Sequence, residues 1–206
     1  MNNKYLHIAI QLALAALVTA AITTQLSIHI ANGFNVVNFF SFFTNLSNIF
    51  AAIMLYFGAY LLIVNKKSRV YDFFRGASVV FMAVVGVVFS LLLTGVDLGT
   101  LLPWVNTTLH YIMPIAVVAY WFIAPPKEFV RLKTAALWLA FPAIYLAYSL
   151  IRGVAINWYA YPFLNPAQDG GYGAIALYSL FIFILFVVFG LILRWGANVR
   201  LKKSVR

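Results

Sequence analysis

The chain has no cysteine and very few acidic residues. The absence of cysteine excludes disulfides, thiolate nucleophiles, thiolate-bound zinc and cysteine-ligated iron–sulfur clusters. The only acidic residues are Asp72, Asp97, Glu128 and Asp169. With so few carboxylates, a carboxylate-rich metal centre is not expected. The sequence therefore predicts neither a metal site nor a cofactor.

Charged residues of either sign are also scarce, and most of the chain is apolar. Charged residues make up 9% of the chain, hydrophobic residues make up 65%, and the mean hydropathy is +0.96. Apolar runs of about 20 residues, which cross a ~30 Å hydrocarbon layer as helix, recur along the chain. We count six such runs, at Ile8 to Ile30, Phe39 to Val64, Phe73 to Thr94, Thr108 to Ala124, Ala135 to Ile151 and Ala174 to Leu193.

Runs of this length and continuity predict helices, because membrane barrel strands are shorter and alternate in polarity. The runs take up most of the chain and leave no soluble domain. The sequence thus predicts an all-α polytopic membrane protein, in which residues 1–206 form a single bundle of six transmembrane helices.

The first run also resembles a signal peptide, with Lys4 before an apolar stretch and small residues at 19–21. We favour a retained helix. Gln25 and His29 continue past Ala21 at i, i+4 spacing, as one face of a longer helix does.

Basic residues predict the orientation, since positive loops stay cytoplasmic. Lys4, the loops around 66–75 and 127–133, and the tail from Arg194 all fall on one side of the six predicted helices. Both termini are therefore predicted to be cytoplasmic, and the protein is predicted to lie in the cell membrane. The net charge of +10 suits contact with anionic lipid, and no pattern favours nucleic acid. Only Arg152 falls on the opposite side.

Polar residues gather at the predicted outer end of the bundle. They are Ser41, Thr44, Asn45, Ser47 and Asn48 in the second run, Asn106, Thr107, Thr108 and His110 around the fourth, and Gln25 and His29 in the first. Ser, Thr and Asn in membrane helices often only join neighbouring helices, with contacts of ~0.6 kcal/mol on average. An ionisable residue such as His110 is costly there, and a functional role is the default interpretation. Thr44 and His110 at one depth are candidates for a nucleophile and its base.

Two pairs of short strings extend this hypothesis. The string FTNLSN at 43–48, followed by LHYIMP at 109–114, resembles the paired signature of the androgen-induced family of six-pass membrane proteins. WVN at 104–106 and YPFLNP at 161–166 fit the same resemblance, which covers nearly the whole chain in helix count and spacing. The chain is similar to the shorter prokaryotic relatives of that family.

The resemblance implies a chemistry. Animal members are threonine hydrolases that cleave fatty acid esters of hydroxy fatty acids with a membrane-embedded threonine and histidine. It places the nucleophile on Thr44 and the base on His110, and it implies a lipid ester substrate.

The residues are compatible with this chemistry. A neutral imidazole activates a hydroxyl at ordinary pH, and the amides of Asn45, Asn48 or Asn106 could support an oxyanion. Asn106 could instead orient the imidazole. Arg152 is predicted either to bind an anionic headgroup or to pair with Asp97 or Asp169.

Two other classes remain open. In a lipid or small-molecule carrier, the same polar cluster would be a binding site, and Pro103, Pro114 and Pro142 would bend helices around it. In a haem electron-transfer protein, His29 and His110 would be axial ligands. The haem hypothesis is weak because membrane redox bundles commonly need a second haem, and no other histidine pair exists.

Overall fold

The computed structural model describes residues 2–96, 102–168 and 170–205, and every regular element among them is helical. The long helices are α1 (Asn2–Ala31), α3 (Phe43–Ile63), α4 (Arg69–Val88), α8 (Ala140–Ile156) and α9 (Gly171–Val205). The shorter ones are α2 (Val36–Phe39), α5 (Pro103–Thr107), α6 (Met113–Ile123), α7 (Leu132–Leu137) and the 3-10 turn η3 (Pro162–Leu164). There are two π-helical segments. The segment η1 (Phe89–Leu93) continues α4, and η2 (Thr108–Ile112) joins α5 to α6. The predicted all-α class is confirmed.

Five helical segments are long and apolar enough to cross a membrane, so the chain is a polytopic membrane protein. They are Asn3–Ala31, Phe43–Ile63, Arg69–Leu93, Leu132–Ile156 and Gly171–Lys202. The predicted run Thr108 to Ala124 lies in the helical stretch from α5 to α6, which is not among the five. Asn106, Thr107 and His110 make its beginning polar. The sixth pass therefore stays a prediction.

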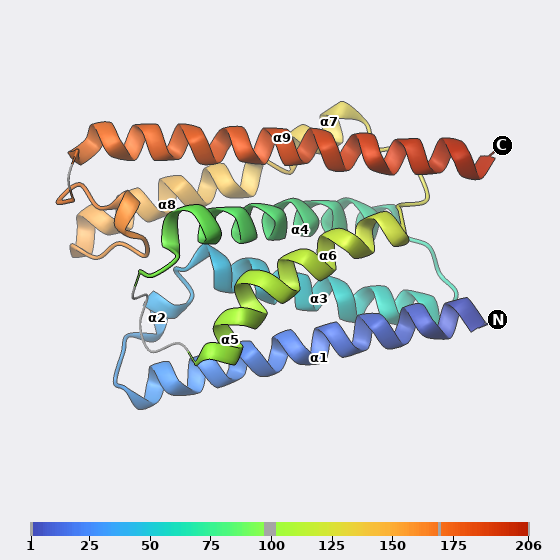
Figure 1. Cartoon of the computed structure of the whole chain (residues 1–206), viewed down its shortest axis with the longest axis horizontal. Helices are drawn as coiled ribbons and strands as arrows, with labels where there is room; N and C mark the ends of the chain where they lie inside the picture. The colour runs from blue at the N-terminus through green and yellow to red at the C-terminus, as the bar shows by residue number, and fades with distance from the viewer. Residues whose placement is uncertain (1, 97–101, 169, 206) are drawn as a thin grey trace.

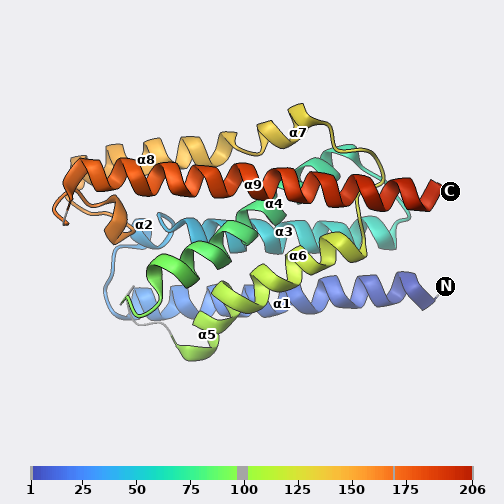
Figure 2. The ribbon, with the colours of Figure 1, turned by 45° about the horizontal axis from the view of Figure 1, so that its top comes forward.

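Helix α4 is the centre of the bundle. In its most apolar window 67% of the residues are buried, against 17% in the windows of Leu132–Ile156 and Gly171–Lys202. It packs against α3, α6 and α9, while α1 lies along α3. Figures 1 and 2 show α8 and α9 side by side on one flank of this core. Their low burial is typical of helices that face lipid.

The two ends of the bundle differ in what they contain. The N- and C-terminal ends of the chain lie together at one end, and α2, the start of α3, α5 and η3 lie at the other (Figure 1). We call this second end the polar end, because it contains Thr44, Asn45, Asn48, Asn106 and His110.

The second helix begins later than predicted. Hydropathy places its start at Phe39, but α3 begins at Phe43. Asn35 caps the separate short helix α2 by accepting the N–H of Val37 on Oδ1 at 2.8 Å. A turn that contains Phe40, Ser41 and Phe42 then precedes α3, and its two phenylalanines keep the average hydropathy high across the break.

A close approach of α4 and α6 shapes the polar end. Pro114 has no N–H to donate to the carbonyl of His110 four residues earlier, and the π-helical segment η2 lies directly before it. A Cβ atom on Gly86 of α4 would lie 2.9 Å from Cβ of Pro114. Only glycine therefore allows this contact, which fixes the position of the turn that carries His110.

Candidate functional site

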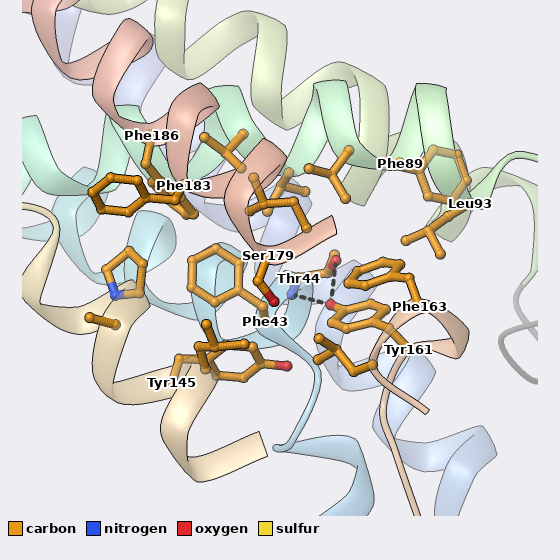
Figure 3. A pocket seen from close by; sticks show the side chains of 18 of the residues that line it. Phe43, Thr44, Phe89, Leu93, Tyr145, Tyr161, Phe163, Ser179, Phe183 and Phe186 are labelled. Carbon is orange, nitrogen blue, oxygen red and sulfur yellow. Dashed lines mark hydrogen bonds between the residues drawn. The ribbon is translucent and has the colours of Figure 1, made fainter. Parts of the chain in front are cut away.

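An apolar cavity of about 220 Å³ lies between α3, α4, α8 and α9 near the polar end. Most of its wall is aliphatic and aromatic, with Phe43, Val84, Phe89, Leu93, Tyr145, Leu146, Phe163, Phe183 and Phe186 among its members. Four side chains bring hydroxyls to the wall, those of Thr44, Tyr145, Tyr161 and Ser179 (Figure 3). The cavity therefore suits a hydrocarbon chain that has a polar group at one point.

Thr44 lies in the first turn of α3, where backbone N–H groups lack partners within the helix. Residue Phe42 before the helix offers no side-chain cap, and the hydroxyl of Tyr161 takes that role. Tyr161 Oη accepts the N–H of Thr44 at 3.1 Å and lies 3.3 Å from Thr44 Oγ1. The side chain predicted as nucleophile is thus buried, lines the cavity and has a tyrosine hydroxyl beside it.

His110 lies in η2 and is only 3% exposed. Its ring stacks on Phe89 with 3.7 Å between ring centroids. Nδ1 lies 2.7 Å from Oδ1 of Asn106 and 3.1 Å from the main-chain carbonyl oxygen of the same residue. Because a carbonyl oxygen only accepts, Nδ1 carries a proton, and a neutral imidazole then has its free lone pair on Nε2. This is the tautomer that a general base needs.

The structure brings the two elements that carry Thr44 and His110 together. Asn48 joins them, because its Nδ2 donates to the carbonyl of Thr44 at 2.9 Å and to that of Leu109 at 3.2 Å. In the part of the chain that the structure describes, no hydrogen bond joins the Thr44 hydroxyl to the imidazole. Phe89, the stacking partner of His110, lines the cavity, whereas His110 itself does not.

The three predicted amides all have partners. Asn45 donates to the carbonyl of Phe39 at 2.9 Å, and Asn48 donates to the two carbonyls named above. Oδ1 of Asn106 accepts a hydrogen bond from Nδ1 of His110. This contact fits the second of its two predicted roles, that of orienting the imidazole. Oxyanion support by Asn45 or Asn48 stays a prediction, and it would require Asn48 to leave one of its two present acceptors.

Arg152 lies at the end of α8 beside a second cavity. Its Nη2 donates to Oδ1 of Asn38 at 2.6 Å, and its guanidinium lies 4.9 Å from the ring centre of Trp158. Nη1 is buried without a hydrogen-bond partner. The alternative partners Asp97 and Asp169 lie outside the described residues.

The second cavity, of about 390 Å³, is polar where the first is apolar. Its wall includes His29, Asn35, Asn38, Trp158, Asn165 and Gln168. Tyr161 belongs to the walls of both cavities. An apolar and a polar compartment therefore meet at the residue that contacts Thr44.

The sequence assigns no role in the site to Tyr161 or Ser179. Trp and Tyr favour the membrane interface in any membrane protein, so the aromatic residues before α9 do not by themselves mark a site. Tyr161 contacts Thr44 across 117 positions of sequence, a distance at which no local pattern reports contact. Ser179 is the one serine within the apolar run from Ala174 to Leu193.

The described residues include no group of three or more His, Asp or Glu side chains suited to a metal ion. His29 makes a 2.9 Å hydrogen bond between Nε2 and the carbonyl of Asn35, and its ring packs edge-on against Phe39. Both histidines of the haem hypothesis thus use one ring nitrogen for a carbonyl oxygen.

In comparisons with known proteins, no family model, no curated protein and no solved structure matches this chain. The resemblance to the androgen-induced family therefore stays a prediction.

Proposed function

We propose that this protein is a membrane-embedded hydrolase of lipid esters, with Thr44 as nucleophile and His110 as base. One observation carries the proposal. A buried threonine hydroxyl lines an apolar cavity of about 220 Å³, and the neighbouring helical turn holds a buried histidine whose Nδ1 carries a proton. The lone pair on Nε2 is then available to a hydroxyl.

The proposed reaction is an acyl transfer through the threonine. Oγ1 of Thr44 bonds to the ester carbonyl carbon while its proton passes to Nε2 of His110. The bond between that carbon and the alkoxy oxygen breaks, and His110 returns the proton to the leaving alcohol. Water then attacks the acyl-threonine, gives a proton to His110 and releases the carboxylic acid, and the proton returns to Thr44.

The two cavities suggest how the substrate lies. The acyl chain occupies the apolar cavity, and the polar part of the lipid occupies the cavity beside Arg152. The unpartnered Nη1 of Arg152 supports the binding of a carboxylate or phosphate, which guanidinium groups hold by charge-assisted hydrogen bonds.

We propose that the chain crosses the cell membrane six times with both termini in the cytoplasm. The helical stretch from Pro103 to Ile123 supplies the sixth pass beside the five apolar segments. The two chain ends lie at one end of the bundle, which an even number of passes requires (Figure 1). Lys66, Lys67 and Arg131 lie in loops at that end and favour the cytoplasm by their charge.

Hydrolysis of a fluorogenic acyl ester by purified protein in liposomes tests the function. The expected result is turnover that Thr44→Ala and His110→Ala both abolish. Thr23→Ala is the matched control, because the Thr23 hydroxyl is exposed and bonds only to carbonyls of its own helix. Turnover that persists in Thr44→Ala would contradict the proposal.

A lipid-binding carrier is the second candidate, and one observation favours it. The hydrogen-bond partner of the Thr44 hydroxyl is Tyr161 and not the imidazole. A carrier would bind a fluorescent fatty acyl probe with equal affinity in the native protein and in His110→Ala, and neither protein would cleave esters.

A further inference from the structure

Ser179 has an unexplained hydroxyl in the wall of the apolar cavity. Its Oγ is buried and has no hydrogen-bond partner. Serine in a membrane helix usually satisfies its hydroxyl on a carbonyl of the preceding turn, as Ser27 does here with Thr23 at 2.9 Å. A buried hydroxyl without a partner costs free energy and calls for an explanation. An acceptor on a bound ligand would provide one.

Tyr161 has a hydrogen atom that is available to the same cavity. Its oxygen accepts the N–H of Thr44 at 3.1 Å, so the tyrosine proton is not used in that contact. The hydroxyl also lies 3.3 Å from Oγ1 of Thr44, which is longer than the 2.5–3.0 Å usual between two hydroxyls. This weak contact is easily exchanged for a better acceptor.

Tyr161 and Ser179 flank Thr44 on the cavity wall. Figure 3 shows Ser179 reaching from α9 toward the side where Thr44 and Tyr161 meet. The remaining cavity hydroxyl, that of Tyr145, already donates to the carbonyl of Ser41 at 2.8 Å. Within the described cavity wall, the two hydroxyls of Tyr161 and Ser179 are therefore the donors able to serve a ligand.

We propose that Tyr161 and Ser179 are the hydrogen-bond donors that hold the ester carbonyl oxygen and stabilise the oxyanion formed by attack of Thr44. The inference rests on the proposed hydrolase function and replaces the amides of Asn45, Asn48 and Asn106, none of which belongs to the cavity wall. Oxyanion stabilisation needs donors already aimed at the developing charge in a site that excludes water. Two hydroxyls in an apolar wall meet this requirement.

The same contact couples substrate binding to activation of the nucleophile. Either hydroxyl of the Tyr161–Thr44 pair can be the donor, at 3.3 Å. When the carbonyl oxygen arrives, Tyr161 donates its proton to that oxygen, and the weak contact between the two hydroxyls is lost. The Thr44 hydroxyl then turns its own proton toward Nε2 of His110. The Thr44 N–H remains on Tyr161 and keeps the tyrosine in place.

Steady-state hydrolysis of a fluorogenic acyl ester by Tyr161→Phe and Ser179→Ala tests the inference. Removing one oxyanion donor lowers kcat by about 10²–10³-fold in other acyl-transfer enzymes. We expect a loss of kcat of about 10²-fold in each variant with a much smaller change in KM. Ser27→Ala is the matched control, because it removes a serine hydroxyl that bonds to a carbonyl of its own helix and lies outside the cavity wall. Ser179→Thr keeps the hydroxyl and should retain most of the native kcat.

The outcomes separate this inference from the proposed function. If Thr44→Ala abolishes turnover while Tyr161→Phe and Ser179→Ala keep native kcat, the donor assignment is overturned and the hydrolase stands. If turnover is indifferent to Thr44→Ala, both fall. Thermal melting of each variant in detergent identifies loss of fold. If Tyr161→Phe unfolds, Ser179→Ala and Ser179→Thr decide the result.

Discussion

At the scale of single residues, the site depends on hydrogen bonds from side-chain N–H groups to carbonyl oxygens, which hold those side chains in place. His110 has its proton on Nδ1 because both nearby atoms of Asn106 are acceptors. Asn48 holds two carbonyls on two different elements. Most amides of the polar end therefore position other groups, and hydroxyls line the cavity.

Asn106→Ala should weaken the base without removing it. The variant loses the Oδ1 contact at 2.7 Å and keeps the main-chain carbonyl at 3.1 Å, so the tautomer persists with a less fixed ring. We expect kcat for ester hydrolysis to fall about tenfold, a part of the ~10²–10⁴ that a positioned base contributes. An unchanged kcat in a folded variant would show that Asn106 does not orient the base.

Asn48→Ala should destabilise the bundle. Both hydrogen bonds of Nδ2 are lost in a residue that is 0% exposed. Membrane hydrogen bonds average ~0.6 kcal/mol, so we expect a loss of roughly 1 kcal/mol in the free energy of unfolding. Thermal denaturation in detergent measures it. The control is Ser27→Ala, whose hydroxyl is bound to its own helix and should leave the melting temperature nearly unchanged.

At the scale of elements, the contact between α4 and α6 determines where His110 lies. Gly86 and Pro114 touch where η2 ends, and the His110 carbonyl lies 3.6 Å from the position of a Cβ on Gly86. A side chain there would separate the two helices. The depth of the histidine thus depends on a glycine in another helix.

Gly86→Ala should therefore lower both stability and activity. Its Cβ would lie 2.9 Å from that of Pro114, and relief of such overpacking typically costs about 1–3 kcal/mol. Gly190→Ala in α9 is the matched control, because a Cβ there meets nothing within 4 Å. Alanine favours helix over glycine, so Gly190→Ala should be neutral or stabilising. Equal melting temperatures for the two variants would contradict this account of the contact.

The elements also show what the sequence could and could not predict. Long apolar runs predicted the helical class and the membrane, because hydrocarbon demands helices of that length. The predicted start of the second helix is too early, since the short helix α2 ends at Phe39 and a turn with two phenylalanines keeps the local hydropathy high up to the start of α3. The contact of Tyr161 with Thr44 depends on how the connection before α9 folds back, and hydropathy does not encode that path.

At the scale of the whole molecule, we propose that the two ends of the bundle lie on opposite sides of the membrane. Positive charge marks the end that holds the chain termini, and the cavities lie toward the other end. Substrate lipid would enter from the outer leaflet, and water would reach the polar cavity from outside.

Single cysteines test this orientation cleanly, because the native chain has none. Lys67 and Gln168 are both exposed and lie in loops at opposite ends of the bundle. In intact cells, a membrane-impermeant maleimide should label Gln168→Cys and leave Lys67→Cys unlabelled until the membrane is permeabilised. Labelling of Lys67→Cys from outside would contradict cytoplasmic termini.

The most direct test of the central claim is the covalent state of Thr44. Purified protein treated with a fluorophosphonate should gain one adduct, and peptide mass spectrometry should place it on Thr44. His110→Ala should remain unmodified because the hydroxyl then lacks its base. An adduct on another residue, or none under conditions that label a control membrane hydrolase, would contradict the account.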